Sequence, residues 1–195
     1  MAESATARRS PLDGLVPTAL PGLEIGERPL GSLVQVAAFP SRQDDAPSAV
    51  DAALGRENIP PMPGPLQSTT RGGTTIMNVA PDRALIAAAR PDLHAALSAS
   101  IPVEEGTVTD LSHARILLCL KGIRARWVLS KGIAIDLHPH AFPVGHTVLT
   151  DIAHIGVILR RADEDAYDLY PYRGYARALL AWLCEAGAAD GRQAA

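Results

Sequence analysis

The stretch Ile155-Gly-Val-Ile-Leu-Arg-Arg-Ala-Asp-Glu-Asp-Ala-Tyr-Asp-Leu-Tyr170 carries the strongest fold signal in this chain of 195 residues. Residues 155–161 and 166–170 have the β-branched and aromatic content of strands, and the acidic residues 163–165 are typical of a hairpin turn. Residues 175–186 then have the periodicity of an amphipathic helix. The apolar face of this helix consists of Leu179, Trp182 and Leu183. The C-terminal part of the chain is therefore predicted to be a strand, turn, strand and helix.

Further strands and helices are predicted upstream by the same patterns. We expect strands at residues 32–39, 74–80, 107–111, 115–120 and 147–152. We expect helices at residues 44–54, 92–98 and 123–131, the last ending at Gly132 in a left-handed cap. Residues 83–89 fit a helix by their alanines and a buried strand by their length. Because strands and helices are interspersed without strict alternation, the fold class is α+β.

Proline is concentrated at the start of the chain. Ten of the 16 prolines fall within the first 75 residues, and each removes a backbone hydrogen-bond donor and disfavours helix before it. We therefore expect residues 1–30 to form an extended arm without a core of its own. One folded domain is predicted over residues 31–187, followed by a flexible tail at 188–195.

Composition excludes some classes of function. Lys and Arg number 18 against 21 Asp and Glu, and aromatic residues are only 4%. The chain thus lacks both the basic excess and the stacking side chains that nucleic-acid binding uses, so we expect no nucleic-acid partner. Residues 1–10 have no apolar signal core, and no run approaches the roughly 18 apolar residues of a membrane span. With Cys119 and Cys184 expected as separate buried thiols, the predicted location is the cytoplasm, away from membranes.

Histidines gather in Asp136-Leu-His138-Pro-His140-Ala-Phe-Pro143, followed by His146. A His-x-His pair near a carboxylate has the donors of a zinc or iron site, so His138, His140 and His146 form one candidate metal site. The two prolines instead favour a rigid irregular loop whose histidines bond to backbone or contact a partner. We favour this second interpretation and expect no metal in the chain.

Sequence signals for catalysis are weak. Ser112 and His113 are adjacent, and neighbouring strand residues point to opposite faces, so they do not form a nucleophile and base pair. Arg71-Gly-Gly73 is too short for a phosphate-binding loop. All four tyrosines lie in residues 167–175 beside Arg173 and Arg177, a composition typical of protein interfaces and of packed corners alike. The chain lacks the catalytic constellation of a stand-alone enzyme.

Three blocks of sequence are distinctive: Asp110-Leu-Ser-His-Ala-Arg115, Leu120-Lys-Gly-Ile-Arg-Ala-Arg-Trp-Val-Leu129 and Ile135-Asp-Leu-His-Pro-His-Ala-Phe-Pro143. With Gly156-Val-Ile-Leu159, Tyr167-Asp-Leu-Tyr170 and Tyr175-Ala-Arg-Ala-Leu-Leu-Ala-Trp182, they resemble the gamma subunits of heterotetrameric sarcosine oxidases. Ala80-Pro-Asp-Arg-Ala-Leu-Ile86 is similar to a Gly-Pro-Asp-x-Trp-Leu segment of that family, with Ala80 and Ala84 replacing its Gly and Trp. The resemblance covers about residues 30–185.

This resemblance implies a fold and a setting. The fold would be that of the aminomethyltransferase folate-binding domain, with mixed, mainly antiparallel sheets packed by helices and residues 83–89 as a strand. The partners would be alpha, beta and delta subunits, which would hold FAD, FMN, NAD, zinc and tetrahydrofolate. The complex would demethylate sarcosine with oxygen to glycine and hydrogen peroxide, releasing formaldehyde or methylenetetrahydrofolate. No residue matches the folate-handling acid of the aminomethyltransferases, so we expect no cofactor in this chain.

The sequence therefore predicts a structural, non-catalytic gamma-type subunit of an oxidoreductase complex in sarcosine catabolism. The arm before residue 30 and the loop at 136–146 are its expected interface elements. The expected partner-contact residues are His138, His140, Phe142, His146, Tyr170, Tyr172 and Arg173. Two alternatives are a subunit of a related N-methyl amine demethylase, such as N-methylglutamate dehydrogenase, and a stand-alone folate-dependent one-carbon transferase.

Overall fold

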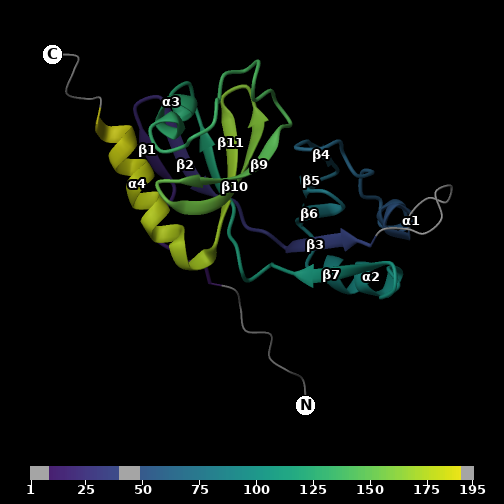
Figure 1. The fold of residues 1–195 in the computed structure, drawn as a ribbon. Coiled ribbons are helices and arrows are strands. Elements are labelled where there is room, and N and C mark those ends of the chain that lie inside the picture. Colours follow the sequence, from purple (N-terminus) through teal and green to yellow (C-terminus); the bar gives the residue numbers. More distant parts are fainter. Residues whose placement is uncertain (1–8, 40–48, 190–195) are drawn as a thin grey trace.

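Two antiparallel sheets, packed face to face between two pairs of helices, make up the computed structural model, which describes residues 9–39 and 49–189 (Figure 1). Sheet A contains, in spatial order, β1 (Thr18–Leu20), β2 (Leu23–Glu27), β8 (Leu118–Lys121), β11 (Ala166–Pro171), β10 (Ile155–Asp163) and β9 (Thr147–Ile152). Sheet B contains β4 (Ser68–Arg71), β5 (Thr74–Ala80), β6 (Arg83–Ala88), β3 (Ser32–Ala38) and β7 (Gly106–Asp110). Every ladder between these strands is antiparallel.

The helices form the two outer layers. Helices α3 (Ala125–Ser130) and α4 (Ala176–Ala188) pack on sheet A, and α1 (Ala49–Arg56) and α2 (Leu93–Ser100) pack on sheet B (Figure 1). A short 3-10 helix, Arg173–Tyr175, joins β11 to α4. None of the helices in the described ranges is long and apolar enough to cross a membrane.

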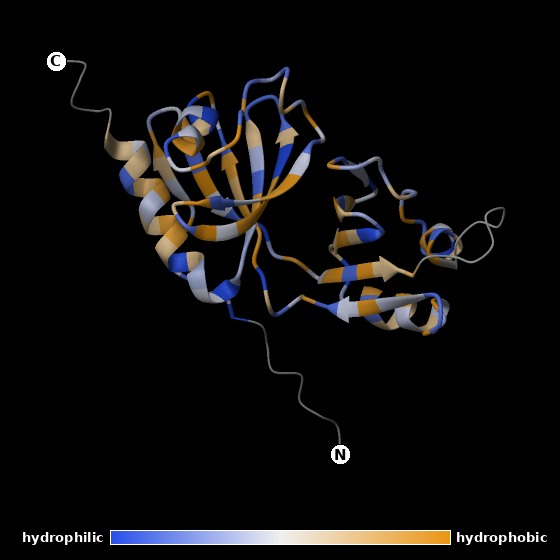
Figure 2. Ribbon diagram, viewed as in Figure 1, coloured by the Kyte–Doolittle hydropathy of each residue, from blue (hydrophilic) through white to orange (hydrophobic). Residues whose placement is uncertain are grey.

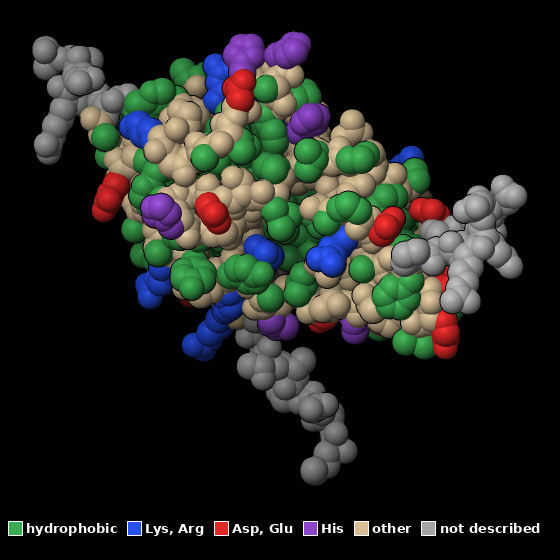
Figure 3. All heavy atoms as spheres, viewed as in Figure 1, with side chains coloured by type: hydrophobic (Ala, Val, Ile, Leu, Met, Phe, Trp, Pro, Cys, Tyr) green, Lys and Arg blue, Asp and Glu red, His purple; other side chains and the backbone are tan. Residues whose placement is uncertain are grey.

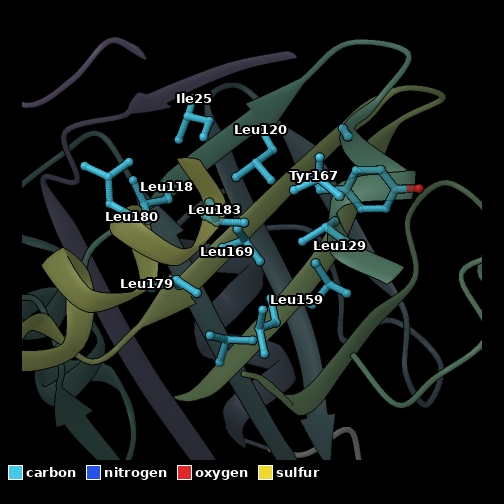
Figure 4. Close-up of a cluster of buried hydrophobic side chains, with 14 of the residues drawn as sticks. Ile25, Leu118, Leu120, Leu129, Leu159, Tyr167, Leu169, Leu179, Leu180 and Leu183 are labelled. Atoms are coloured by element: carbon cyan, nitrogen blue, oxygen red, sulfur yellow. The ribbon is translucent and has the colours of Figure 1, made fainter. Parts of the chain in front are cut away.

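Three hydrophobic clusters separate these four layers. The largest lies between sheet A and its helices, where Leu118, Leu120 and Leu169 meet Leu179 and Leu183 of α4 (Figure 4). The second lies between sheet B and α1 and α2, and the third lies between the two sheets. Hydropathy follows this arrangement, with apolar residues along the strands and polar residues at most turns (Figure 2).

Successive residues of one strand serve two clusters. In β8, Leu118 and Leu120 face α4, whereas Cys119 faces sheet B. In β6, Leu85 faces sheet A, whereas Ile86 faces the α1 and α2 layer. A strand that is buried on both faces needs no polar alternation. This burial explains why residues 83–89, ambiguous in sequence, form a strand.

Most predicted elements are confirmed. The strands at 32–39, 74–80, 107–111 and 147–152, the C-terminal hairpin and all of the helices are present within two residues of at least one predicted end. Residues 44–48 of the predicted first helix lie outside the described residues, as do residues 190–195 of the predicted tail. The α+β class with antiparallel sheets is therefore confirmed.

The predicted N-terminal arm is wrong for residues 12–27. Strand β2 pairs with β8 in the register Ile25↔Leu120, and β1 pairs with β2. Leu12, Leu23 and Ile25 are buried in the largest cluster. The prolines flank these strands instead of interrupting them, so they remove no ladder donor. Residues 1–8 lie outside the described residues.

Gly132 does not form the predicted left-handed cap, since its φ is not among the positive values. A Cβ at this position would lie 2.5 Å from the Trp182 ring of α4. The glycine is required here by close packing of α4 on the end of α3, and a local sequence pattern cannot reveal that contact.

We predict that Ile25→Ala lowers the free energy of unfolding by about 2–5 kcal/mol, because it leaves a cavity in the largest cluster. Leu15→Ala is the matched control, since Leu15 belongs to the same N-terminal segment and is exposed. Its effect should stay within about 0.5 kcal/mol. Urea unfolding of the purified chain measures both changes. Equal, small effects would mean that the N-terminal strands are not part of the core.

Candidate partner-contact surfaces

The histidine-rich loop at residues 136–146 connects α3 to β9 and is held firmly by sheet A. The buried Arg161 of β10 donates from Nη1 to the Phe142 carbonyl at 2.9 Å. The Gly145 amide donates to the Arg161 carbonyl at 2.8 Å, and the Ser68 amide of β4 donates to the Gly145 carbonyl at 2.7 Å. Backbone held by bonds from two sheets has little conformational freedom to lose on binding.

Histidines project from this loop. His138 and His140 are exposed, and Figure 3 shows histidine side chains projecting from the end of the molecule at the top of the view. Their backbone is ordered by local bonds: the His138 amide donates to Asp136 Oδ1 at 2.8 Å, and the His140 amide donates to His138 Nδ1 at 3.3 Å. His146 packs its ring edge-on against Phe142, with 5.8 Å between ring centroids. No group of three His, Cys, Asp or Glu side chains arranged to hold a metal occurs among the described residues.

A hollow of about 440 Å³ lies beside the loop. Its walls are Pro139, Pro143 and Val144 on the loop side, and Arg126, Arg161, Glu164 and Asp165 on the other. The two basic and two acidic side chains balance each other, so the hollow has no dominant charge. It can accept a mixed polar and apolar surface.

The four tyrosines of residues 167–175 differ in their exposure to solvent. Tyr167 and Tyr170 are 1% exposed, the first in the largest cluster and the second between the two sheets. Burial, followed by the nearby Asp168 carboxylate, raises the pKa of Tyr170. Tyr172 and Tyr175 lie beyond the end of β11 and are exposed. Strand alternation and coverage by sheet B thus decide which tyrosines reach solvent.

Two of the predicted contact residues are buried. Phe142 is 5% exposed and Tyr170 is 1% exposed, so both side chains pack against neighbours in their own chain. Contact of either side chain with a partner stays a prediction. His138, His140, His146, Tyr172 and Arg173 remain accessible at least in part.

The accessible residues form two separate regions. The histidine loop adjoins the hairpin end of β10 and β11, where Arg161 pairs with Tyr167. Tyr172 and Arg173 follow the opposite end of β11, where Pro171 pairs with Val157. The residues predicted to contact partners thus lie at opposite ends of sheet A.

A buried polar network between the sheets was not predicted from the sequence. Asp168 is 2% exposed and accepts from Arg160 Nη1 at 2.9 Å. Arg160 also donates to Ser68 Oγ at 2.8 Å and to Thr70 Oγ1 at 2.9 Å, both on β4. Arg28 lies 3.3 Å from the other Asp168 oxygen. The sequence did contain a signal, since the hairpin register pairs Arg160 directly with Asp168.

Reactive side chains in the interior have structural partners. Cys119 lies 3.4 Å from Asp168 Oδ1, and burial followed by this carboxylate raises the pKa of the thiol to about 12. Such a thiol is not a nucleophile at neutral pH. The Ser112 hydroxyl accepts from the Leu33 amide at 2.9 Å, while His113 is exposed, so the two do not form a catalytic pair.

The architecture defines the chain as an α+β protein built on two stacked antiparallel sheets. Its fold is similar to that of glycine cleavage system aminomethyltransferase T from Bartonella henselae, with a TM-score of 0.57 over 83% of this chain and 45% of that chain. Sequence identity is 21%, so this likeness concerns the fold alone. A more extensive likeness is to a chain of the heterotetrameric sarcosine oxidase from Corynebacterium sp. U-96, solved with pyrrole 2-carboxylate. The TM-score is 0.79 at 28% identity, over 93% of this chain and 95% of that chain.

The sequence comparisons agree. The model of the sarcosine oxidase, gamma subunit family matches residues 42–189. The sarcosine oxidase subunit gamma of Arthrobacter sp. is 34% identical, covering 94% of this chain and 92% of the relative. That of Corynebacterium sp. strain P-1 is 32% identical over the same shares. The chain belongs to the sarcosine oxidase gamma subunit family.

We predict that Asp168→Ala destabilises the chain by about 3–5 kcal/mol, because it leaves the Arg160 guanidinium buried without its partner. Asp13→Ala, at an exposed aspartate, should change stability by less than about 0.5 kcal/mol. Replacing both partners, as Arg160→Met with Asp168→Leu, should recover much of the loss. Thermal and urea unfolding measure these differences. A harmless Asp168→Ala would show that the pair does not link the sheets.

Proposed function

We propose that this chain is the gamma subunit of a heterotetrameric sarcosine oxidase, where it serves assembly and not catalysis. In the proposed complex, sarcosine, oxygen and water give glycine, formaldehyde and hydrogen peroxide. With tetrahydrofolate present, the methyl carbon leaves as methylenetetrahydrofolate. The observation that carries the proposal is the family match, together with a fold likeness that extends over nearly the whole chain.

The interior supports a structural role for the chain. Among the described residues, the buried charged side chains are Asp168, Arg115, Arg160 and Arg161, and they bond to the chain's own side chains and carbonyls. Flavin, nicotinamide and folate chemistry needs a cofactor-binding site, which we assign to alpha, beta and delta partners, with zinc held there as well. The proposed partners would work in the cytoplasm.

We further propose that the accessible part of the histidine loop contacts one of these partners. His138 and His140 are presented on backbone that sheets A and B hold in place. An imidazole at such a position can donate or accept a hydrogen bond across an interface without ordering a flexible loop first. The exposed Val144 adds an apolar contact beside them.

Co-purification tests the proposed function. The tagged chain is recovered from cells that also express the proposed alpha, beta and delta subunits. The eluate is then examined by absorption spectroscopy and gel electrophoresis. We expect stoichiometric partners, a flavin spectrum, and peroxide release on adding sarcosine. N-methylglutamate, assayed in parallel, distinguishes a related amine demethylase. A colourless chain that elutes alone would contradict the proposal.

We predict that the double variant His138→Ala/His140→Ala weakens assembly by at least about tenfold, the loss expected for a central interface contact. The measurement is a titration of the remaining subunits with the purified chain. His94→Ala on α2 is the matched control, since it removes a partly exposed histidine from the outer layer of sheet B. Unchanged binding by the double variant, with wild-type stability, would remove the histidine loop from the interface.

A further inference from the structure

Sheet B leaves one end of sheet A uncovered. Leu149 of β9 is the cross-strand partner of Ile158, so both side chains lie on the face that meets sheet B. Ile158 is buried there, whereas Leu149 on the edge strand is 54% exposed. Tyr172 follows the buried Tyr170 by two positions, and it is 49% exposed. The inner face of sheet A thus continues past sheet B as an accessible apolar surface.

A hollow of about 310 Å³ lies on this surface, bordered by Leu149, Gly156 and Tyr172. Gly156 has no positive φ, and a Cβ added to it would meet only Asp151 Oδ1, at 3.5 Å. Packing within this chain therefore does not require a glycine at this position, the second residue of β10. Glycine weakens a strand interior and is found where another backbone or a ligand approaches closely.

The aromatic wall of the hollow is rigid. The Arg115 guanidinium stacks on the Tyr172 ring, 3.8 Å from its centroid, and donates from Nη1 to the Tyr170 carbonyl at 2.6 Å. The backbones of Arg115 and Tyr172 also pair in an antiparallel bridge, which fixes the position of the Tyr172 ring relative to Arg115. A ring held in this way loses little rotamer entropy on binding. Tyr175, one turn later, is 58% exposed.

The hollow is lined by one basic and one acidic side chain, Arg115 and Asp151, and two further arginines, Arg173 and Arg177, follow Tyr172 along the chain. Arg173 and Arg177 have no carboxylate partner among residues 9–39 and 49–189. The Arg173 side chain donates from Nη2 to the Arg9 carbonyl, and its Nη1 is buried without an acceptor in that same part of the chain. In the space-filling view, Lys and Arg side chains gather near the lower end of α4, where the helix begins (Figure 3). A buried guanidinium nitrogen without an acceptor favours a carboxylate arriving from elsewhere.

We propose that this area, the Tyr172 surface (Leu149, Gly156, Tyr172, Arg173, Tyr175 and Arg177), docks an extended, acidic segment of a partner subunit. The segment places a large apolar side chain in the hollow, passes close over Gly156, and aligns carboxylates with Arg173 and Arg177. The inference rests on the proposed function, which identifies the partner as another sarcosine oxidase subunit. It adds the chemistry of the contact and a second docking region, separate from the histidine loop.

The decisive variant is Gly156→Val. A Cβ at this position makes only an ordinary contact with Asp151 Oδ1, at 3.5 Å, and valine favours a strand, so the free energy of unfolding should stay unchanged or rise. Filling the hollow should nevertheless weaken assembly with the remaining sarcosine oxidase subunits by at least about tenfold. Tyr172→Ala should weaken it similarly. Wild-type binding by a stable Gly156→Val chain would overturn the proposal.

Charge reversal tests the acidic character of the partner. Arg173→Glu and Arg177→Glu should each weaken assembly several-fold at about 0.1 M salt, with a smaller difference at about 0.5 M salt, where exposed charges are screened. Arg71→Glu, at an exposed arginine of β4, is the matched control and should bind like the wild type. Equal effects of all three reversals, or none, would refute carboxylate recognition.

Other occupants give distinguishable results. Tighter assembly on deleting residues 2–8, which precede Arg9 beside Arg173, would assign the surface to the chain's own N-terminus and overturn the proposal. A free-chain dimer, abolished by Gly156→Val in light scattering, would assign it to a second copy and overturn it too. If the wild-type chain binds no partner at all, the proposed function fails. If it binds while the variants bind equally well, only this inference fails.

Discussion

A buried ion pair links the two halves of the molecule. Arg160 and Asp168 face each other across the β10–β11 hairpin, and Arg160 extends to Ser68 and Thr70 on β4 of the other sheet. The pair replaces apolar contact at a place where sheet A meets the edge of sheet B. Because Ser68 also bonds to the Gly145 carbonyl, the same network holds the histidine loop. The position of one candidate contact surface thus depends on a charge pair in the interior.

Packing two sheets face to face has a second consequence. Each sheet needs apolar side chains on both faces, one for the other sheet and one for its helices, which accounts for runs such as β6 and β8. Where one sheet extends beyond the other, the same alternation leaves apolar residues in solvent. Leu149 and Tyr172 are exposed for this reason. The accessible surface at the end of sheet A is therefore a product of the layer geometry.

The candidate site was predictable in part. The sequence predicted partner contacts at the histidine loop and at Tyr170, Tyr172 and Arg173, and the structure leaves His138, His140 and Tyr172 accessible. It did not reveal that Tyr170 is enclosed by sheet B, nor that Phe142 lies beneath His146. Tyr172 lies two positions after Tyr170, just beyond the end of β11, so alternation along the chain does not separate them. Only the point at which sheet B ends makes one interior and the other exposed.

The sequence by itself determined the strands at 32–39, 74–80, 107–111 and 147–152, the C-terminal hairpin, the helices and the α+β class, because these depend on local propensity and periodicity. The family blocks also lie within the chain and need no coordinates. Only the tertiary structure decided that residues 18–27 join sheet A beside β8, almost a hundred residues away, and that Gly132 accommodates Trp182. Pairing of distant strands is decided by which partner buries the apolar face, and that choice is made by the whole chain at once.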